Sequence, residues 1–164
     1  MNRYTMFRHY WWLISLATVL AISLIVYFYQ DGRMPLIGSV LATGLAFIYF
    51  VQQQRLAETS LFKELFTEFN SRYDKLNDKL VALRGQTKEL TVEQKAVLLD
   101  YFNLCAEEYL FYKEGYIYPE VWTAWCRGML WYLEEEPFRS FWALEERTKS
   151  YYGLDLDQIR RSAA

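Results

Sequence analysis

The sequence predicts an all-α fold made of an N-terminal transmembrane helical hairpin, a long juxtamembrane helix and a C-terminal cytoplasmic helical bundle. Three observations support this fold class: two uncharged apolar runs near the N-terminus, an unbroken heptad pattern after them, and helix-capping signals in the remainder. A chain of 164 residues has room for one modest domain beside two membrane helices. The three parts are expected at residues 1–54, 55–84 and 85–164.

The first apolar run, residues 10–29, has no formally charged side chain and about the 20 residues that cross a hydrocarbon core. It is longer than the apolar region of a signal peptide and ends in aromatic instead of small residues, which argues against a cleaved secretory signal. A second uncharged run, residues 34–51, lies at the short end of the spanning range. Both runs are expected to be transmembrane helices.

Basic residues flank the predicted hairpin on one side. Arg3 and Arg8 precede the first span, Arg55 and Lys63 follow the second, and the loop between the spans has one basic and one acidic residue. The positive-inside rule therefore predicts a multi-pass membrane protein with both termini in the cytoplasm. Neither span contains Asp, Glu, Lys or Arg, so no ion path or substrate site is expected within the membrane.

Small residues recur at four-residue spacing in both spans and allow helices to approach closely. The first span contains Ala17 and Ala21, and the second contains Gly38, Ala42 and Ala46. These residues predict close packing either within one hairpin or between protomers. The second possibility makes Gly38, Ala42 and Ala46 candidate self-assembly residues.

The segment after the spans has apolar residues at alternating steps of four and three, which is the heptad pattern of a coiled coil. Its candidate self-assembly residues are Phe62, Phe66, Phe69, Tyr73, Leu76 and Leu80. A helix with such a stripe must bury it. Three partners are possible: the same helix in another protomer, the following helices of its own chain, or both. The bulky aromatic positions favour a helical bundle over a simple dimeric zipper.

Capping signals divide the distal part of the chain into three predicted helices. Thr91 and Gln94 have capping-box spacing, and Gly115 offers a left-handed C-terminal cap. Pro119 and Pro137 stand where a first helical turn tolerates proline. The three helices are expected at about residues 92–114, 119–135 and 137–151.

The second of these helices has more apolar surface than one core-facing stripe requires. Trp122, Trp125 and Met129 belong to the stripe that is expected to face the core. The additional apolar face, which is the candidate partner-binding surface, consists of Val121, Ala124, Gly128 and Trp131. Either a partner protein or another helix of the same chain is expected to cover it.

The residue types show no catalytic, cofactor-binding or metal-ligating pattern. His9 is the only histidine, and the two cysteines, Cys105 and Cys126, lie on apolar helix faces with no histidine in their own part of the chain. Glu108 differs from the other carboxylates because it projects between apolar residues, where a tyrosine hydroxyl or Arg127 is expected to satisfy it. The chain is therefore predicted to have no cofactor and not to be an enzyme.

Charge limits the partners of the distal part. Residues 85–164 contain 9 basic and 14 acidic side chains, an excess of negative charge that disfavours nucleic acid as a partner. The expected partners are the lipid bilayer and either a second copy of the chain, in a homo-oligomer, or another protein.

The chain resembles a family of small, uncharacterised bacterial membrane proteins with two transmembrane helices and a helical cytoplasmic domain. Some loosely similar proteins are described as phage abortive-infection membrane proteins. Besides the hairpin, the resemblance rests on three segments: LFKELFTEFNSRYDKLNDKL, LLDYFNLCAEEYLFYKEGYI and VWTAWCRGM. It covers most of residues 56–153 and includes no catalytic motif. It implies the same architecture, a location in the bacterial inner (cytoplasmic) membrane and a role in defence.

The function expected from these features is that of a membrane-anchored cytoplasmic interaction protein, a scaffold or an adaptor, without catalysis. One alternative is a membrane-perturbing effector of a bacterial phage-defence system that acts through oligomerised hairpins. Another is an enzyme or a sensor of a small ligand.

Overall fold

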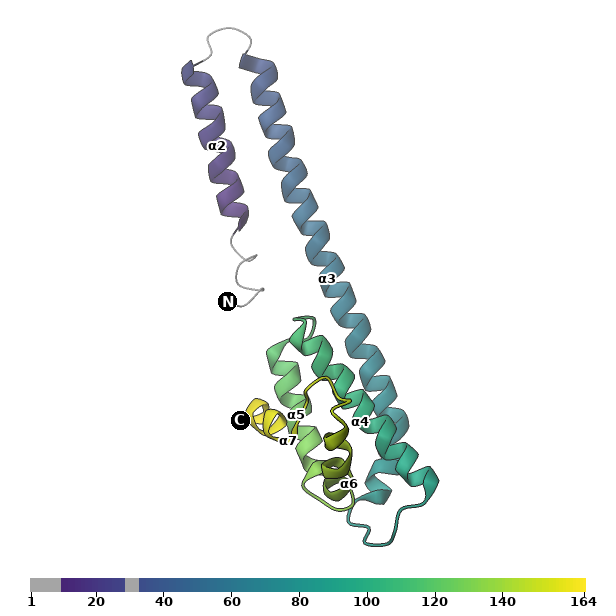
Figure 1. The fold of residues 1–164 in the computed structure, drawn as a ribbon. Helices are drawn as coiled ribbons and strands as arrows, with labels where there is room; N and C mark the ends of the chain where they lie inside the picture. Colours follow the sequence, from purple (N-terminus) through teal and green to yellow (C-terminus); the bar gives the residue numbers. More distant parts are fainter. Residues whose placement is uncertain (1–9, 29–32) are drawn as a thin grey trace. The chain divides into compact units, whose positions relative to one another are not determined.

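The computed structural model describes residues 10–28 and 33–164, and all regular elements in these residues are helical. The predicted all-α class is confirmed. The chain divides into two compact units, Met1–Ser60 and Leu61–Ala164. The elements labelled in Figure 1, with the short 3₁₀ helix η1, are α2 (Tyr10–Phe28), α3 (Arg33–Leu83), α4 (Val92–Lys113), α5 (Pro119–Leu133), α6 (Phe138–Glu145), η1 (Glu146–Thr148) and α7 (Leu156–Ala163).

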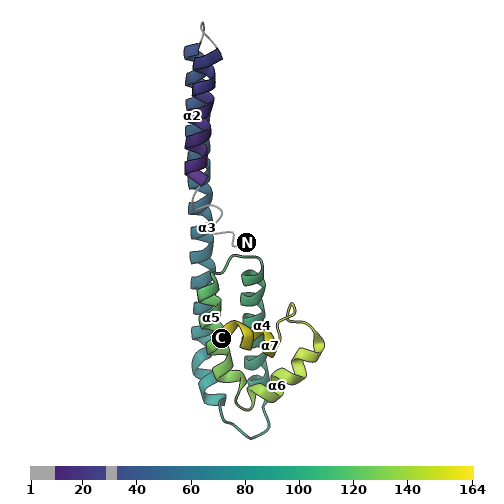
Figure 2. The ribbon, with the colours of Figure 1, turned by 90° about the vertical axis from the view of Figure 1, so that its left-hand side faces the viewer.

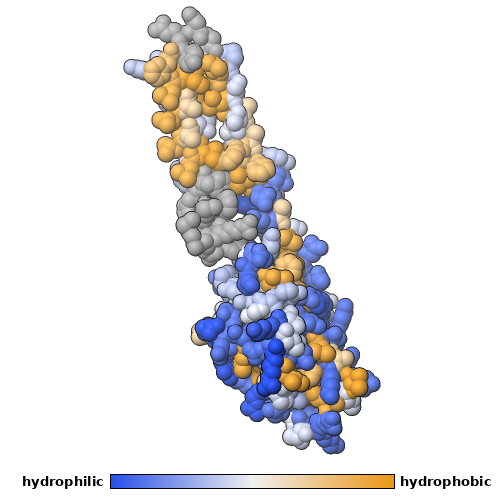
Figure 3. Space-filling model, viewed as in Figure 1, coloured by the Kyte–Doolittle hydropathy of each residue, from blue (hydrophilic) through white to orange (hydrophobic). Residues whose placement is uncertain are grey.

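Two helices have the composition of membrane segments. α3 contains a stretch that is long and apolar enough to cross a membrane, and α2 is a shorter apolar helix. Hydrophobic residues cover most of the visible surface of α2 and of the first part of α3 (Figure 3). Exposed apolar surface costs about 25 cal/mol per Å² in water, so lipid suits these surfaces better than solvent does. The two helices are thus consistent with membrane association.

The second predicted span and the predicted juxtamembrane helix belong to one continuous helix, α3. The expected boundary at residues 54 and 55 is not a helix end. The reason is local, because the connecting residues QQQRLAETS contain neither proline nor glycine and most of them are good helix formers. The boundary between the two compact units follows Ser60, inside this helix.

Within Met1–Ser60, α2 and α3 approach each other closely at Gly44. A Cβ atom at that position would lie 2.9 Å from Oγ1 of Thr18, so only glycine fits without a shift. Small side chains line the same groove: Ala17, Thr18, Ala21, Ser39, Thr43 and Gly44. Gly38 instead has no neighbouring atom within 4 Å of a Cβ position, and Ala42 and Ala46 are exposed. The predicted stripe of Gly38, Ala42 and Ala46 therefore takes no part in this close approach.

Within Leu61–Ala164, one hydrophobic core joins the second part of α3 to the shorter helices. Figure 1 shows α4 running along that part of α3, and Figure 2 gives a second view. α5 contacts α3 through the rings of Trp125 and Phe66, and α7 packs on α5. The six largest fully buried side chains among the described residues are all aromatic: Trp122, Trp142, Tyr132, Phe69, Phe102 and Phe138.

The heptad seam of α3 packs within this core. Its members Phe69 and Leu80 are buried, and Phe62, Tyr73 and Leu76 pack half-buried against the same cluster. Phe66 is 38% exposed, and its ring stacks on Trp125 with the centroids 6.0 Å apart. Of the three partners considered for the seam, the structure shows the following helices of the same chain.

The start of α4 follows the predicted capping box. Oγ1 of Thr91 accepts a hydrogen bond from the backbone N of Gln94 at 3.3 Å, and Oε1 of Gln94 accepts one from the backbone N of Thr91 at 3.0 Å. Gly115, just beyond the helix, has a φ of +79°, the left-handed conformation that favours glycine. Local signals therefore suffice for both ends of this helix.

The helix expected over residues 137–151 is shorter than predicted, since α6 ends at Glu145 and η1 follows it. The side chain of Thr148 donates a hydrogen bond to the carbonyl of Glu145 and accepts one from the backbone N of Ser150, an alternative to helical bonds that ends helices. Tyr151 then packs its ring against Trp142, 5.2 Å between centroids. α7, which the sequence did not predict, follows after an Asp155 cap.

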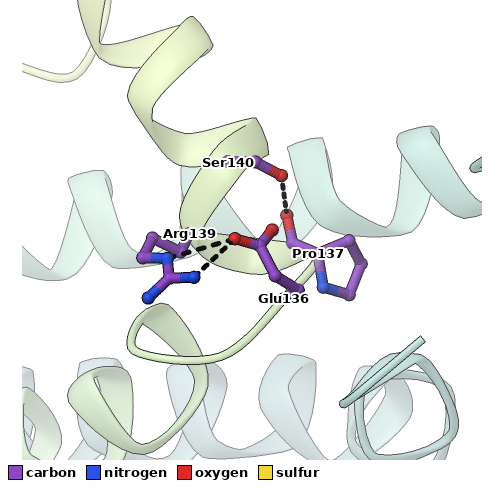
Figure 4. Close-up of polar contacts among 4 residues, drawn as sticks. All are labelled: Glu136, Pro137, Arg139 and Ser140. Carbon is purple, nitrogen blue, oxygen red and sulfur yellow. Dashed lines mark hydrogen bonds and ion pairs between the residues drawn. The ribbon is translucent and has the colours of Figure 1, made fainter. Parts of the chain in front are cut away.

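Pro137 precedes α6 instead of lying in its first turn. Beside it, the guanidinium of Arg139 donates to Oε1 of Glu136 at 2.9 and 3.1 Å, and the hydroxyl of Ser140 donates to the carbonyl of Pro137 at 3.1 Å (Figure 4). These contacts fix the turn between α5 and α6. All of them are local in sequence.

Candidate functional site

A pocket of about 190 Å³ lies among α3, α4 and α5 in the unit Leu61–Ala164. It exists because α5 presents Ala124 and Gly128, one turn apart, where larger residues would fill the space. A Cβ atom at Gly128 would meet no atom within 4 Å. The other lining residues include three aromatic and three polar side chains: Tyr73, Tyr101, Trp125, Asn70, Cys105 and Glu108.

Glu108 is the one charged side chain that is buried in the part of the chain that the structure describes, with 6% exposure. Its carboxyl group makes no hydrogen bond and no ion pair with any described residue. Burial raises the pKa of Glu108 to about 8, while Arg72 opposes the increase and Glu107 adds to it. At neutral pH this carboxyl group is therefore mostly protonated.

The cations near Glu108 are engaged elsewhere. Arg72 donates to both carboxylate oxygens of Glu107, with a distance of 3.1 Å for Nη2 to Oε1. Arg127, which the sequence suggested as a partner of Glu108, instead donates from Nε to the carbonyl of Ala163 at 2.9 Å. That expectation was wrong because α7, absent from the predicted fold, brings its C-terminal carbonyl to Arg127.

Tyrosine hydroxyls do not satisfy Glu108 either. The hydroxyl of Tyr73 lies 3.3 Å from that of Tyr132, which donates to Oδ1 of Asn77 at 3.2 Å. The amide nitrogen of Asn70 donates to the carbonyl of Phe66 at 2.7 Å, and its amide oxygen has no hydrogen bond among the described residues. The carboxyl group of Glu108 and the amide oxygen of Asn70 therefore have no partner among the described residues.

The two thiols are poor nucleophiles in this setting. Burial raises the pKa of Cys105 well above its usual range, and Glu108 adds to the increase. Burial also raises the pKa of Cys126 to about 12. Both groups are therefore neutral at pH 7, whereas a reactive cysteine needs a lowered pKa. Among the described residues, no group of three or more His, Cys, Asp or Glu side chains is arranged to hold a metal ion.

The four residues of the candidate partner-binding surface have different surroundings. Ala124 and Gly128 are exposed and border the Glu108 pocket, whereas Val121 packs partly against the core. Trp131 is 48% exposed, and the guanidinium of Arg84 lies 3.8 Å from the centroid of its ring. The open part of the surface is therefore the stretch from Ala124 to Gly128, and Trp131 has an intramolecular cation on one face.

A larger hollow of about 390 Å³ lies beside α3 and α4. It is lined by Arg72, Glu107, Lys75 and Asp100, among others. Its two closest charges, on Arg72 and Glu107, neutralise each other. The smaller pocket is the stronger candidate site because its carboxyl group has no partner.

No protein family matches this chain, and neither the curated proteins nor the solved structures include one that is significantly similar to it. The function of this chain is therefore inferred from the geometry of its site.

Proposed function

We propose that this chain is a membrane-anchored interaction protein, a scaffold or an adaptor without catalysis. In this proposal α2 and the first part of α3 span the bacterial inner membrane, with both termini in the cytoplasm. The unit Leu61–Ala164 then binds a protein partner next to the bilayer. The resemblance to abortive-infection proteins remains a prediction about the process in which such binding takes part.

The observation that supports this proposal is the exposed face of α5. Ala124 and Gly128 are exposed on this helix and leave room for the backbone of another helix to approach. Trp131, about two turns beyond Ala124, is a half-exposed aromatic of the kind that anchors interfaces. The excess of acidic over basic side chains in residues 85–164 favours a basic helix as the occupant.

Site-specific photocrosslinking in native membranes tests the partner surface. A photoreactive residue at Ala124 should give one crosslinked protein adduct, whereas the same residue at Ala143, an exposed alanine of α6, should give none. Equal crosslinking at both positions, or crosslinking of Ala124 to lipid alone, would contradict the proposal. An adduct with twice the mass of the chain would identify a second copy as the partner.

Cysteine labelling tests the orientation. A cysteine replacing Ala164, which is exposed, should react with a membrane-impermeant maleimide only after the cells are permeabilised. A cysteine replacing Gly32, in the predicted loop and outside the described residues, should react in intact cells. The native thiols Cys105 and Cys126 are buried and should give little background. Labelling at position 164 in intact cells would reverse the orientation.

A second candidate function is a membrane effector that acts through oligomerised hairpins. The observation that favours it is the stripe of Gly38, Ala42 and Ala46, which packing between α2 and α3 leaves exposed. A second copy of the chain would fit there. In this case overexpression should arrest growth and depolarise the membrane, and Ala42→Ile should prevent both effects while Leu41→Ile should not.

A further inference from the structure

We propose that the pocket behind Ala124 and Gly128 binds the primary ammonium group of a lysine side chain, which a basic partner helix inserts toward Glu108. The inference rests on the proposed function, because the helix that carries the lysine is the partner of the α5 face. It adds the chemistry by which that partner is recognised.

The polar residues that line the pocket favour a ligand with hydrogen-bond donors. Glu108 and the amide oxygen of Asn70 are acceptors in one pocket, and no described cation pairs with Glu108. The carboxyl oxygens of Glu108 have no partner within the described part of the chain, and an ammonium group supplies three donors and a charge. A ligand with a cationic donor therefore supplies a partner that these residues do not.

The aromatic residues that line the pocket favour a ligand with a positive charge. Tyr73, Tyr101 and Trp125 line the same pocket as the carboxyl group. The faces of such rings attract an ammonium ion, and the attraction increases when the site is desolvated. A neutral donor such as a hydroxyl group would gain much less from these rings.

The dimensions fit a slender stem. The pocket volume of about 190 Å³ is more than ten times the roughly 10 to 15 Å³ that a single water molecule needs on the same measure. An alkyl chain can lie against the small residues Ala124 and Gly128 with its compact head beside Glu108, because all three residues line the pocket. A guanidinium group is planar and wider than an ammonium group, so the compact ammonium head needs less space beside Glu108. Lysine is therefore the better fit.

Binding should be linked to pH. Burial raises the pKa of Glu108 to about 8, so an ammonium ion that favours the carboxylate must displace a proton at neutral pH. The charged groups that act on Glu108 are Arg72 on α3 and Glu107 on α4, while Cys105 stays neutral and the lining residues of α5 are uncharged. Affinity should consequently rise with pH until Glu108 is ionised.

The probe is n-butylamine, the side-chain analogue of lysine, and its neutral control is n-butanol. Calorimetric titration of the full-length protein in detergent should show that the amine binds at least about tenfold more tightly than the alcohol. In buffers of different ionisation enthalpy at neutral pH, the heats should report the release of most of one proton for each amine bound.

Two variants test whether the carboxyl group and the opening are responsible. Glu108→Gln should reduce the affinity for the amine to that for the alcohol, and Glu114→Gln, which removes an exposed charge at the end of the same helix, should not. Gly128→Leu should close the opening and abolish binding, whereas Ala143→Leu should leave binding unchanged. Gly128→Leu leaves Glu108 in place, so it tests the site even if Glu108→Gln fails to fold.

Equal affinity for amine and alcohol, no binding of the amine, or unchanged binding by Glu108→Gln would each overturn the inference. If the amine does not bind while Ala124 still crosslinks to a protein, the interaction function is supported and the lysine-binding pocket is contradicted. If the amine binds through Glu108 but Ala124 crosslinks to no protein, the ammonium chemistry stands, and a partner helix as its source is overturned together with the proposed function.

Discussion

Arg72 binds both carboxylate oxygens of Glu107 and leaves the adjacent Glu108 without a partner. The two glutamates are neighbours in α4, but consecutive helical residues point about 100° apart. Glu107 is consequently half-exposed beside α3, whereas Glu108 faces the space between α3 and α5. Arg72 on α3 thus pairs with the half-exposed carboxylate of Glu107 and leaves the buried carboxyl group of Glu108 unpaired.

Glu108 should make the folded state less stable as pH rises. Its pKa increases from 4.5 for the ordinary group to about 8 in the fold, so the folded state holds the proton more tightly. Stability should be greatest below about pH 4.5 with respect to this group and fall up to about pH 8, at about 1.4 kcal/mol per pH unit at most. Denaturant unfolding of the full chain, followed by tryptophan fluorescence, measures this slope. Glu108→Gln should lack this component, and an equal slope in that variant would contradict the assignment.

Replacing Glu107 should lower the pKa of Glu108. Glu107 adds to the increase, and Glu107→Gln also frees the guanidinium of Arg72 from its ion pair. The pH at which stability stops falling should therefore shift downward from about 8. The same unfolding series on Glu114→Gln is the control and should keep the wild-type midpoint.

Two tryptophans of α5 should respond very differently to truncation. Trp122 is 1% exposed, so Trp122→Ala should cost about 3 to 5 kcal/mol of folding free energy. Trp131→Ala should cost only about 1 kcal/mol, mainly the cation–π contact with Arg84, because the ring is 48% exposed. Thermal melting of the full chain in detergent distinguishes them. A loss for Trp131→Ala as large as that for Trp122→Ala would place Trp131 in the core.

Two glycines should respond with opposite signs to alanine. Gly128 lies inside α5 with open space around its Cβ position, so Gly128→Ala should stabilise the fold by about 0.5 to 1 kcal/mol. Gly85 has a φ of +78°, so Gly85→Ala should destabilise it. Denaturation midpoints of the two variants measure the difference. Stabilisation of both would show that the backbone at Gly85 is not held in the left-handed region.

The heptad seam should behave as an internal core. Leu80 is fully buried within the chain, so Leu80→Ala should cost about 2 to 5 kcal/mol. The loss should be independent of protein concentration, because no second chain is needed to cover the seam. Light scattering together with melting at two concentrations checks this. A loss that disappears at high concentration would assign the seam to self-assembly.

The sequence by itself determined the features that depend on neighbouring residues. The apolar stretches, the heptad stripe and the capping box at Thr91 and Gln94 all act within a few positions of the chain, so the helical class and the start of α4 could be read without the fold. The unusual position of Glu108 on its helix was also visible, since it follows from helical periodicity.

Only the tertiary structure decided how these parts meet. The ion pair of Arg72 with Glu107 joins residues on two helices, and Arg127 donates to the carbonyl of Ala163 in α7, a helix that starts at the Asp155 cap. The pocket arises where α3, α4 and α5 pack around the small residues Ala124 and Gly128. A buried carboxyl group finds its partner by distance in space, not along the chain, and for that reason the unpaired state of Glu108 could not be predicted from the sequence.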